Sequence, residues 1–139
     1  MDHLVIISKK RKLLNKILSG EKKIESRWYK YKRQPFGCIS EGDVVYFKES
    51  GGPVFVKANV EKVLVYENLN LEVISEIIKR YGNLIGINLN SIEEVRNKRY
   101  CILIFLNDAQ KIEPFEINKK GFGLMNAWIS VDNINKLRK

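Results

Sequence analysis

The residues best placed to do chemistry lie in one short segment, GEKKIESR, which runs from Gly20 to Arg27. From Lys22 onward the pattern alternates like a β-strand, so Glu25 and Arg27 are expected on the same face. A carboxylate and a guanidinium on one face can pair, and they can also offer one ligand an acceptor and a planar fork of donors. On spacing alone, a solvent-exposed ion pair of little energetic value remains the alternative.

A cluster of four cations precedes the apolar stripe of a helix predicted over residues 9–19, namely Lys9, Lys10, Arg11 and Lys12. In the first turn of a helix, cations oppose the positive end of the helix dipole. A phosphate bound at that end would reverse the sign of this cost. The alternative is a solvated, lysine-rich face.

Aromatic and basic residues are mixed in the segment from Arg27 to Arg33 (RWYKYKR). Nucleic acid bases can stack on such rings while cations hold the phosphates. The alternation turns Trp28 toward the core, and it leaves Tyr29 on the face of Arg27 as the candidate ligand contact. Trp128, on the last predicted strand, could belong to the core or to a ligand cage.

The composition favours an anionic partner. The chain has 25 Lys plus Arg against 16 Asp plus Glu, a net charge of +9, and a pI near 9.6. Such an excess attracts phosphate-rich polymers, although a lysine-rich genome would also produce it. With 139 residues, of which 45% are hydrophobic, the chain is expected to form a single domain over residues 1–139.

The cysteine and histidine content argues against metal sites. Cys38 and Cys101 form no C-x-x-C pair, and one histidine cannot supply a zinc cluster, so we expect no metal and no cofactor. Serine or cysteine hydrolase chemistry based on His3 is not expected either, because His3 sits beside the N-terminus. No apolar run approaches the roughly 20 residues of a membrane span, and the first residues lack signal-peptide features. We therefore expect a cytoplasmic protein without membrane contact. The sequence does not indicate a protein partner.

The order of elements indicates an α+β barrel and not a doubly wound sheet, because regular crossover helices are lacking. Helices are predicted at 9–19, capped by Ser8, at 71–81, capped by Asn70 and closed by Gly82, and at 91–97, begun by a capping box at Ser91. Strands are predicted at 4–7, 22–31, 44–49, 54–66, 100–106, about 110–117, and 126–131, with a loop at 121–123.

The motif G-x-K-x-x-E-x-R after a helix, followed by Gly42-Asp43 at the start of a strand, resembles the ASCH (ASC-1 homology) domain family of the PUA-like superfamily. The resemblance extends over "KILSGEKKIESR", "GDVVYF" and "VKANVEKV", about the first half of the chain. It implies a PUA-like β-barrel of about five or six mostly antiparallel strands with two or three flanking helices. It also implies a cleft for RNA or a nucleotide-like ligand, lined by Lys22, Glu25, Arg27 and Tyr29.

The resemblance leaves enzymatic activity open. Some ASCH proteins are small amidohydrolases of acetylated cytidine nucleosides that use a lysine, a threonine and a glutamate, and ribonuclease activity has been ascribed to others. Lys22 matches the lysine, but Glu25 stands where the threonine would be, and the catalytic glutamate has no clear counterpart. We expect an RNA- or nucleotide-binding module; the alternative is a hydrolase of a modified nucleoside, or a ribonuclease, with Lys22 and Glu25 as catalytic groups. A third possibility is an adaptor whose basic face docks an acidic protein.

Overall fold

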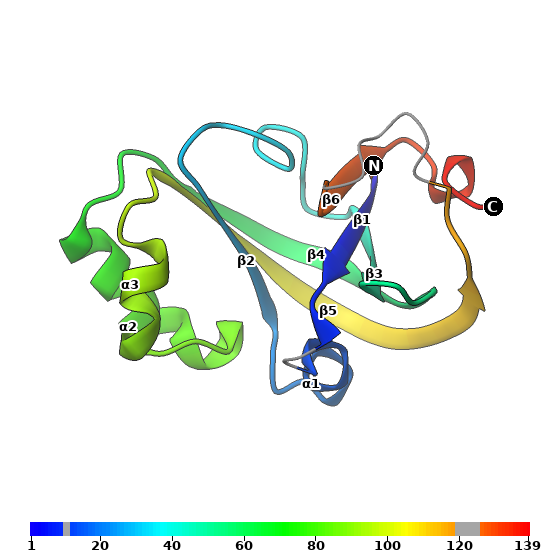
Figure 1. The fold of residues 1–139 in the computed structure, drawn as a ribbon, viewed down its shortest axis with the longest axis horizontal. Coiled ribbons are helices and arrows are strands. Elements are labelled where there is room, and N and C mark those ends of the chain that lie inside the picture. The colour runs from blue at the N-terminus through cyan, green and yellow to red at the C-terminus, as the bar shows by residue number, and fades with distance from the viewer. Residues whose placement is uncertain (10–11, 119–125) are drawn as a thin grey trace.

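A curved, mixed β-sheet forms the body of the molecule and curls into a half-barrel (Figure 1). The computed structural model describes residues 1–9, 12–118 and 126–139. Within these residues the sheet has six strands in the order β2-β5-β4-β3-β1-β6. The strands are β1 (Asp2–Ile7), β2 (Ile24–Tyr29), β3 (Val44–Glu49), β4 (Val54–Tyr66), β5 (Tyr100–Phe115) and β6 (Trp128–Val131).

The pairing of the strands leaves two edges that face each other across the half-barrel. β1 pairs with β3 in parallel, and the other neighbours pair antiparallel. β2 and β6 are the edge strands, and Arg27 of β2 lies over the ring of Trp128 of β6. The predicted α+β, PUA-like barrel of mostly antiparallel strands is confirmed.

Two of the strands are long enough to join the barrel to a helical lobe. β4 has 13 residues and β5 has 16, and Figure 1 shows their ends beside the lobe that contains α2 and α3. The α-helices of the described residues are α1 (Leu13–Ser19), α2 (Leu71–Ile85) and α3 (Ile92–Val95). None of the described helices is long and apolar enough to cross a membrane.

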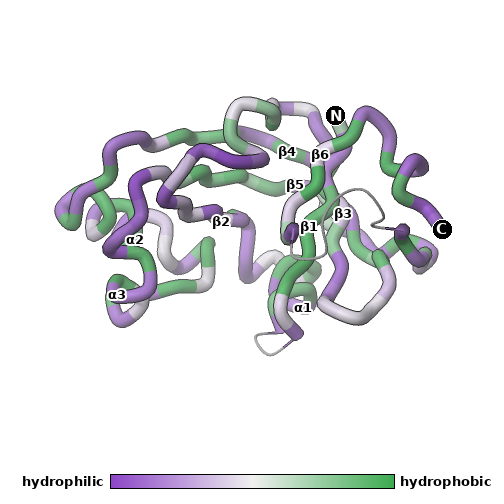
Figure 2. The backbone as a smooth tube through the Cα atoms, turned by 45° about the horizontal axis from the view of Figure 1, so that its top comes forward, coloured by the Kyte–Doolittle hydropathy of each residue, from purple (hydrophilic) through white to green (hydrophobic). Residues whose placement is uncertain are grey.

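Separate hydrophobic cores stabilise the barrel and the lobe. Inside the barrel, Leu14 and Ile17 of α1 pack against strand residues such as Phe47 and Ile104. In the lobe, the apolar face of α2 covers Ile24 of β2 and part of β5. Figure 2 shows the hydrophobic residues in green along β1 and β5. Because residues 101–104 of β5 are fully buried, this part of the strand is covered on both faces.

The first helix begins later than predicted. α1 starts at Leu13, not at residue 9, and its N-cap is Lys12, which has a left-handed backbone (φ 51°) and no capping side chain. Ser8 is therefore not the cap, and Lys9 precedes the helix. The Lys12 N–H donates to the Lys9 carbonyl. Lys10, Arg11 and the predicted loop at 121–123 lie outside the described residues.

The second helix ends later than predicted. α2 is capped by Asn70 as expected, but it continues through Gly82 to Ile85 and ends at Gly86, which has φ 92°. Gly82 is needed for close packing, because a Cβ there would lie 2.7 Å from the Ile87 carbonyl oxygen. The chain after Gly86 thus folds back onto the last turn of α2.

Two smaller predictions were also wrong. The capping box at Ser91 is absent, since Ser91 makes no side-chain cap bond and α3 is one short turn. The two strands predicted on either side of residue 108 are one strand, β5, with Asp108 at a positive φ of 52° and Pro114 near its end.

Candidate ligand cleft

The edge strand β2 carries three of the candidate site residues, Glu25, Arg27 and Tyr29, at alternating positions, and Lys22 lies just before the strand. Its single strand partner is β5, with Glu25 opposite Ile104 and Arg27 opposite Ile102. Ile24 and Trp28 pack against the α2 core, whereas Tyr29 packs against the barrel core. The predicted alternation along β2 is therefore present. We call Lys22, Glu25, Arg27 and Tyr29 the β2 row.

Lys22 is a buried cation that holds the end of α2. Its side chain is 4% exposed, and Nζ donates to the carbonyls of Ile24 (2.7 Å) and Ile85 (2.6 Å). Ile85 is the last residue of α2, where carbonyls lack helical partners and a positive charge is favourable. The ammonium therefore fastens the helical lobe to the start of β2.

Glu25 lies between two cations without a close bond to either. Its Oε1 is 3.7 Å from Lys22 Nζ, and its Oε2 is 3.9 Å from an Arg27 Nη2. Within the described residues, Glu25 Oε2 and Arg27 Nε are the buried side-chain atoms that lack a hydrogen-bond partner. Unpaired buried polar groups are costly. The row therefore holds one unsatisfied acceptor and one unsatisfied donor, and the Arg27 side chain is partly exposed.

A small cavity of about 160 Å³ opens beside Lys22 and Glu25. Ser26 of β2 and Glu94 of α3 also line it, so it lies between the barrel edge and the helical lobe. Typical ligand pockets have volumes of roughly 300–1,000 Å³. This cavity can therefore hold a small group or one part of a larger ligand.

Arg27 bridges the seam of the half-barrel. Its Cζ lies 5.2 Å from the ring centroid of Trp128 on β6, within the range of a cation–π contact. Trp128 is 1% exposed and belongs to the barrel core, so the core interpretation of this residue is correct. The ring nevertheless supports a guanidinium that is 16% exposed.

Tyr29 is less available to a ligand than the sequence suggested. Its hydroxyl donates to the Gln34 carbonyl at 3.0 Å, and the Arg33 Cζ lies 5.4 Å from its ring centroid. Burial raises the pKa of Tyr29 above its usual value of 10.0, although Arg27 and Arg33 lower it. Tyr29 is thus a neutral donor that is already engaged.

A polar cluster behind Trp128 was not predicted. His3 is fully buried, and its Nε2 lies 2.8 Å from Asp43 Oδ2. Its Nδ1 accepts from Trp128 Nε1 at 3.2 Å and lies 2.8 Å from the Ser130 hydroxyl. Trp128 can only donate and Asp43 accepts, so these partners select the neutral tautomer with the proton on Nε2. In agreement, burial lowers the pKa of His3 below 6.5, against the raising effect of Asp43.

This cluster shows that the position of His3 beside the N-terminus was a poor reason to set the residue aside. A position beside the N-terminus does not place a residue at the periphery, because β1 lies between β3 and β6 in the sheet. When a serine hydroxyl bonds to a neutral imidazole and the imidazole bonds to a carboxylate, the serine can become a nucleophile. Here the lone pair of Nδ1 is shared between Ser130 and Trp128, and we interpret the cluster as the support that orients Trp128 beneath Arg27. No sequence signal could have assembled it, because its members are 40 and 127 residues apart.

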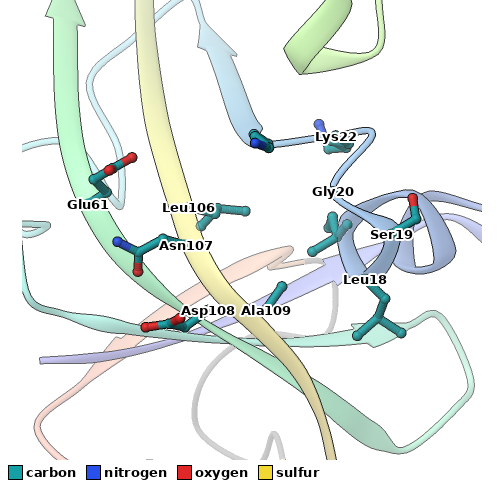
Figure 3. A pocket seen from close by; sticks show the side chains of 11 residues that line it. Leu18, Ser19, Gly20, Lys22, Glu61, Leu106, Asn107, Asp108 and Ala109 are labelled. Carbon is teal, nitrogen blue, oxygen red and sulfur yellow. The ribbon is translucent and has the colours of Figure 1, made fainter.

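A larger cavity of about 420 Å³ lies on the other side of the β2 entry, between the end of α1 and the β4–β5 pair (Figure 3). Gly20 and Lys22 line it, and Glu61 and Asp108 lie opposite them. Two lysines, Lys22 and Lys23, and two carboxylates line it, so the cavity has no excess of positive charge that would favour a phosphate. The rest of the β2 row does not line it.

Of the basic cluster before α1, the structure describes Lys9 and Lys12, and Lys12 is the N-cap of the helix. Figure 1 shows α1 beside the start of β2, whereas Tyr29 is the last residue of that strand. Residues 20–23 join the C-terminal end of this helix to β2, and Lys12 lies at the other end of the helix. Among the described residues, no group of three or more His, Cys, Asp or Glu side chains could hold a metal ion.

Comparison with solved structures identifies the fold. No protein-family model and no curated protein matches the sequence. The structure of the ASCH protein from Zymomonas mobilis superposes with a TM-score of 0.69 and 14% identity, covering 99% of this chain and 96% of that one. Two single-substitution variants of that protein superpose with a TM-score of 0.70 at the same identity, covering 99% and 97% of this chain and 99% and 91% of theirs.

The architecture is thus that of a PUA-like α+β barrel. More specifically, the chain has the fold of an ASCH domain, as its motif and order of elements predicted.

The role assigned to Lys22 predicts a large loss of stability when its charge is removed. Lys22→Met keeps most of the volume but leaves the Ile24 and Ile85 carbonyls and Glu25 without their cation. We expect the free energy of unfolding to fall by about 3–5 kcal/mol, as when one partner of a buried pair is removed. Lys23→Met, on the exposed neighbour, should change it by less than about 0.5 kcal/mol. Urea titration followed by circular dichroism measures the free energy of unfolding of both variants. An equally small decrease in Lys22→Met and Lys23→Met would contradict the anchoring role of Lys22.

The lowered pKa of His3 predicts a pH dependence of stability. The unfolded chain binds a proton at His3 below about pH 6.5, whereas the folded protein resists protonation until a lower pH. Stability should therefore decrease as the pH falls below 6.5, by at most about 1.4 kcal/mol per pH unit. His3 is the single histidine of the sequence, so His3→Gln should remove the slope between pH 5 and 6.5. A protein that becomes more stable on acidification in this window would contradict a neutral His3.

Proposed function

We propose that this protein binds RNA or a nucleotide-like ligand in a basic cleft along the β2 row. The observation that carries the proposal is the adjacent pair of unsatisfied buried atoms, Glu25 Oε2 and Arg27 Nε, in the described residues. Glu25 Oε2 accepts a hydrogen bond and Arg27 Nε donates one. Both side chains lie on the same face of the edge strand β2. Both requirements are met by a ligand that carries amino groups and phosphates.

The charges around the pair support an anionic ligand with a base. Arg27 can bind a phosphate or a base edge through its planar fork of donors. Glu25 cannot attract phosphate, but it can accept from an amino group, and contacts of that kind give specificity where phosphate contacts give position. Lys22 is bound to two carbonyls, so it contributes positive potential and not a direct contact.

Two substitutions test the cleft. Arg27→Ala should weaken binding of a labelled single-stranded RNA by about 1.5–3 kcal/mol, the value of a hydrogen bond to a charged group. Glu25→Gln, which keeps the shape but removes the charge, should weaken binding of the preferred ligand by about 1–3 kcal/mol. Fluorescence anisotropy over a series of salt concentrations gives both affinities, and thermal unfolding gives stability.

Arg138 provides a matched control for Arg27. Its Cζ also lies over an aromatic ring, 3.9 Å from the centroid of Phe115, but near the C-terminus, away from β2 (Figure 1). Arg138→Ala removes the same charge and the same kind of contact. If Arg27→Ala and Arg138→Ala lose the same amount of RNA affinity, the loss comes from the net charge alone. If Arg27→Ala and Glu25→Gln both bind RNA like the wild type, the cleft is not the binding site.

Hydrolysis of a modified nucleoside is a second candidate, favoured by one observation. Lys22, Glu25 and Glu94 line the same small cavity, and two carboxylates and an amine are groups that can transfer protons. The engagement of the Lys22 ammonium with two carbonyls argues against it as a free base. We expect no release of acetate from N-acetylated cytidine above the rate of the Glu25→Gln variant. If the wild type releases acetate, and both Glu25→Gln and Glu94→Gln abolish this release, the protein is a hydrolase.

A further inference from the structure

The segment that follows β2 presents an exposed aromatic ring among cations. Tyr31 is 78% exposed, more than any other large hydrophobic side chain in the described residues. All five residues from Lys30 to Gln34 are exposed, and three of them are cations. The sequence has no acidic residue between Glu25 and Glu41. The ring is therefore freely accessible within a strongly basic surface.

The cations around Tyr31 are held in place by neighbouring rings. Lys32 Nζ lies 5.1 Å from the centroid of Phe36 and 5.9 Å from that of Tyr100, and it is 3.8 Å from Glu67. Arg33 lies over Tyr29.

Backbone hydrogen bonds fix the same segment. The Phe36 N–H donates to the Arg33 carbonyl at 2.8 Å, and the Cys38 N–H donates to the Pro35 carbonyl at 2.9 Å. A surface ordered in this way loses little entropy when it binds.

We propose that Tyr31 is a stacking platform for a base of single-stranded RNA, whose phosphates contact Lys30 and Arg33. This inference rests on the proposed function of the β2 row and extends it to the substrate class. Tyr31 lies four positions after Arg27, so the Cα atoms of the two residues lie within about 14 Å of each other. One short strand of RNA could therefore reach both the platform and the cleft.

The exposed ring selects among anionic partners. A base in a duplex is stacked on its neighbours, whereas a single strand offers free base faces to an aromatic side chain. An acidic peptide would use the cations, but its carboxylates gain nothing from the face of a tyrosine. The combination of an open ring and flanking cations thus matches a single strand.

The test is the affinity of Tyr31 variants for a fluorescein-labelled single-stranded RNA, measured by anisotropy. Tyr31→Ala should weaken binding roughly 5- to 150-fold, which corresponds to the loss of one stacked base. Tyr31→Phe should bind like the wild type, while Tyr31→Leu, which is apolar but not aromatic, should resemble Tyr31→Ala. The melting temperature of all three variants should match the wild type, because the side chain is exposed.

The ligand supplies a second control. The wild type should bind a strand of the same length that lacks bases no more tightly than Tyr31→Ala binds the intact strand, because such a strand loses both the stacked base and the base contact of Glu25. Duplex RNA should bind the wild type and Tyr31→Ala equally. A loss of duplex affinity in Tyr31→Ala, or equal affinity of both proteins for the intact single strand, would overturn the platform.

The outcomes separate this inference from the proposed function. If Arg27→Ala weakens binding but Tyr31→Ala does not, the cleft stands and the platform falls. If the wild type binds no RNA at low salt, both fall. Binding of polyglutamate as tightly as RNA, with the same sensitivity to Tyr31→Ala, would assign the surface to an acidic protein and overturn the platform.

Discussion

The buried ammonium of Lys22 is the interaction on which the arrangement of this molecule depends. Removing a charge from water costs several kcal/mol, so the ammonium must find oxygen partners where it is buried. It finds them in the carbonyls of Ile24 and Ile85, which belong to the start of β2 and the end of α2. One charge therefore fixes the position of the helical lobe against the edge of the barrel.

A chain of polar contacts extends from this point across the open side of the sheet. Lys22 is close to Glu25, Glu25 to Arg27, and Arg27 lies on the ring of Trp128. Trp128 donates in turn to His3, which Asp43 holds. Because β2 and β6 share no hydrogen bonds in the described sheet, these side chains join its two edges. The same need leaves Glu25 and Arg27 imperfectly paired, which is the property that a ligand could exploit.

Much of the local structure could be predicted from the sequence, because local structure follows from periodicity and from turn residues. The hairpin of β3 and β4 around Gly51, Gly52 and Pro53 has the predicted bounds, and the alternation along β2 placed Glu25 and Arg27 together. The end of α2 was wrong by several residues. A glycine reads as a helix terminator, whereas Gly82 is required by close packing against the Ile87 carbonyl.

The sequence by itself determined the class of fold, the edge strand with its charged face, and the excess of positive charge. Only the tertiary structure decided that Lys22 is an anchor, that Trp128 is a buried support, and that His3 belongs to a polar cluster. The physical reason is distance along the chain. Lys22 and Ile85 are 63 residues apart, and His3 and Ser130 are 127 residues apart, so no local pattern encodes their contact. The charge of a side chain can be read from the sequence, but the partner that neutralises it is chosen by the fold.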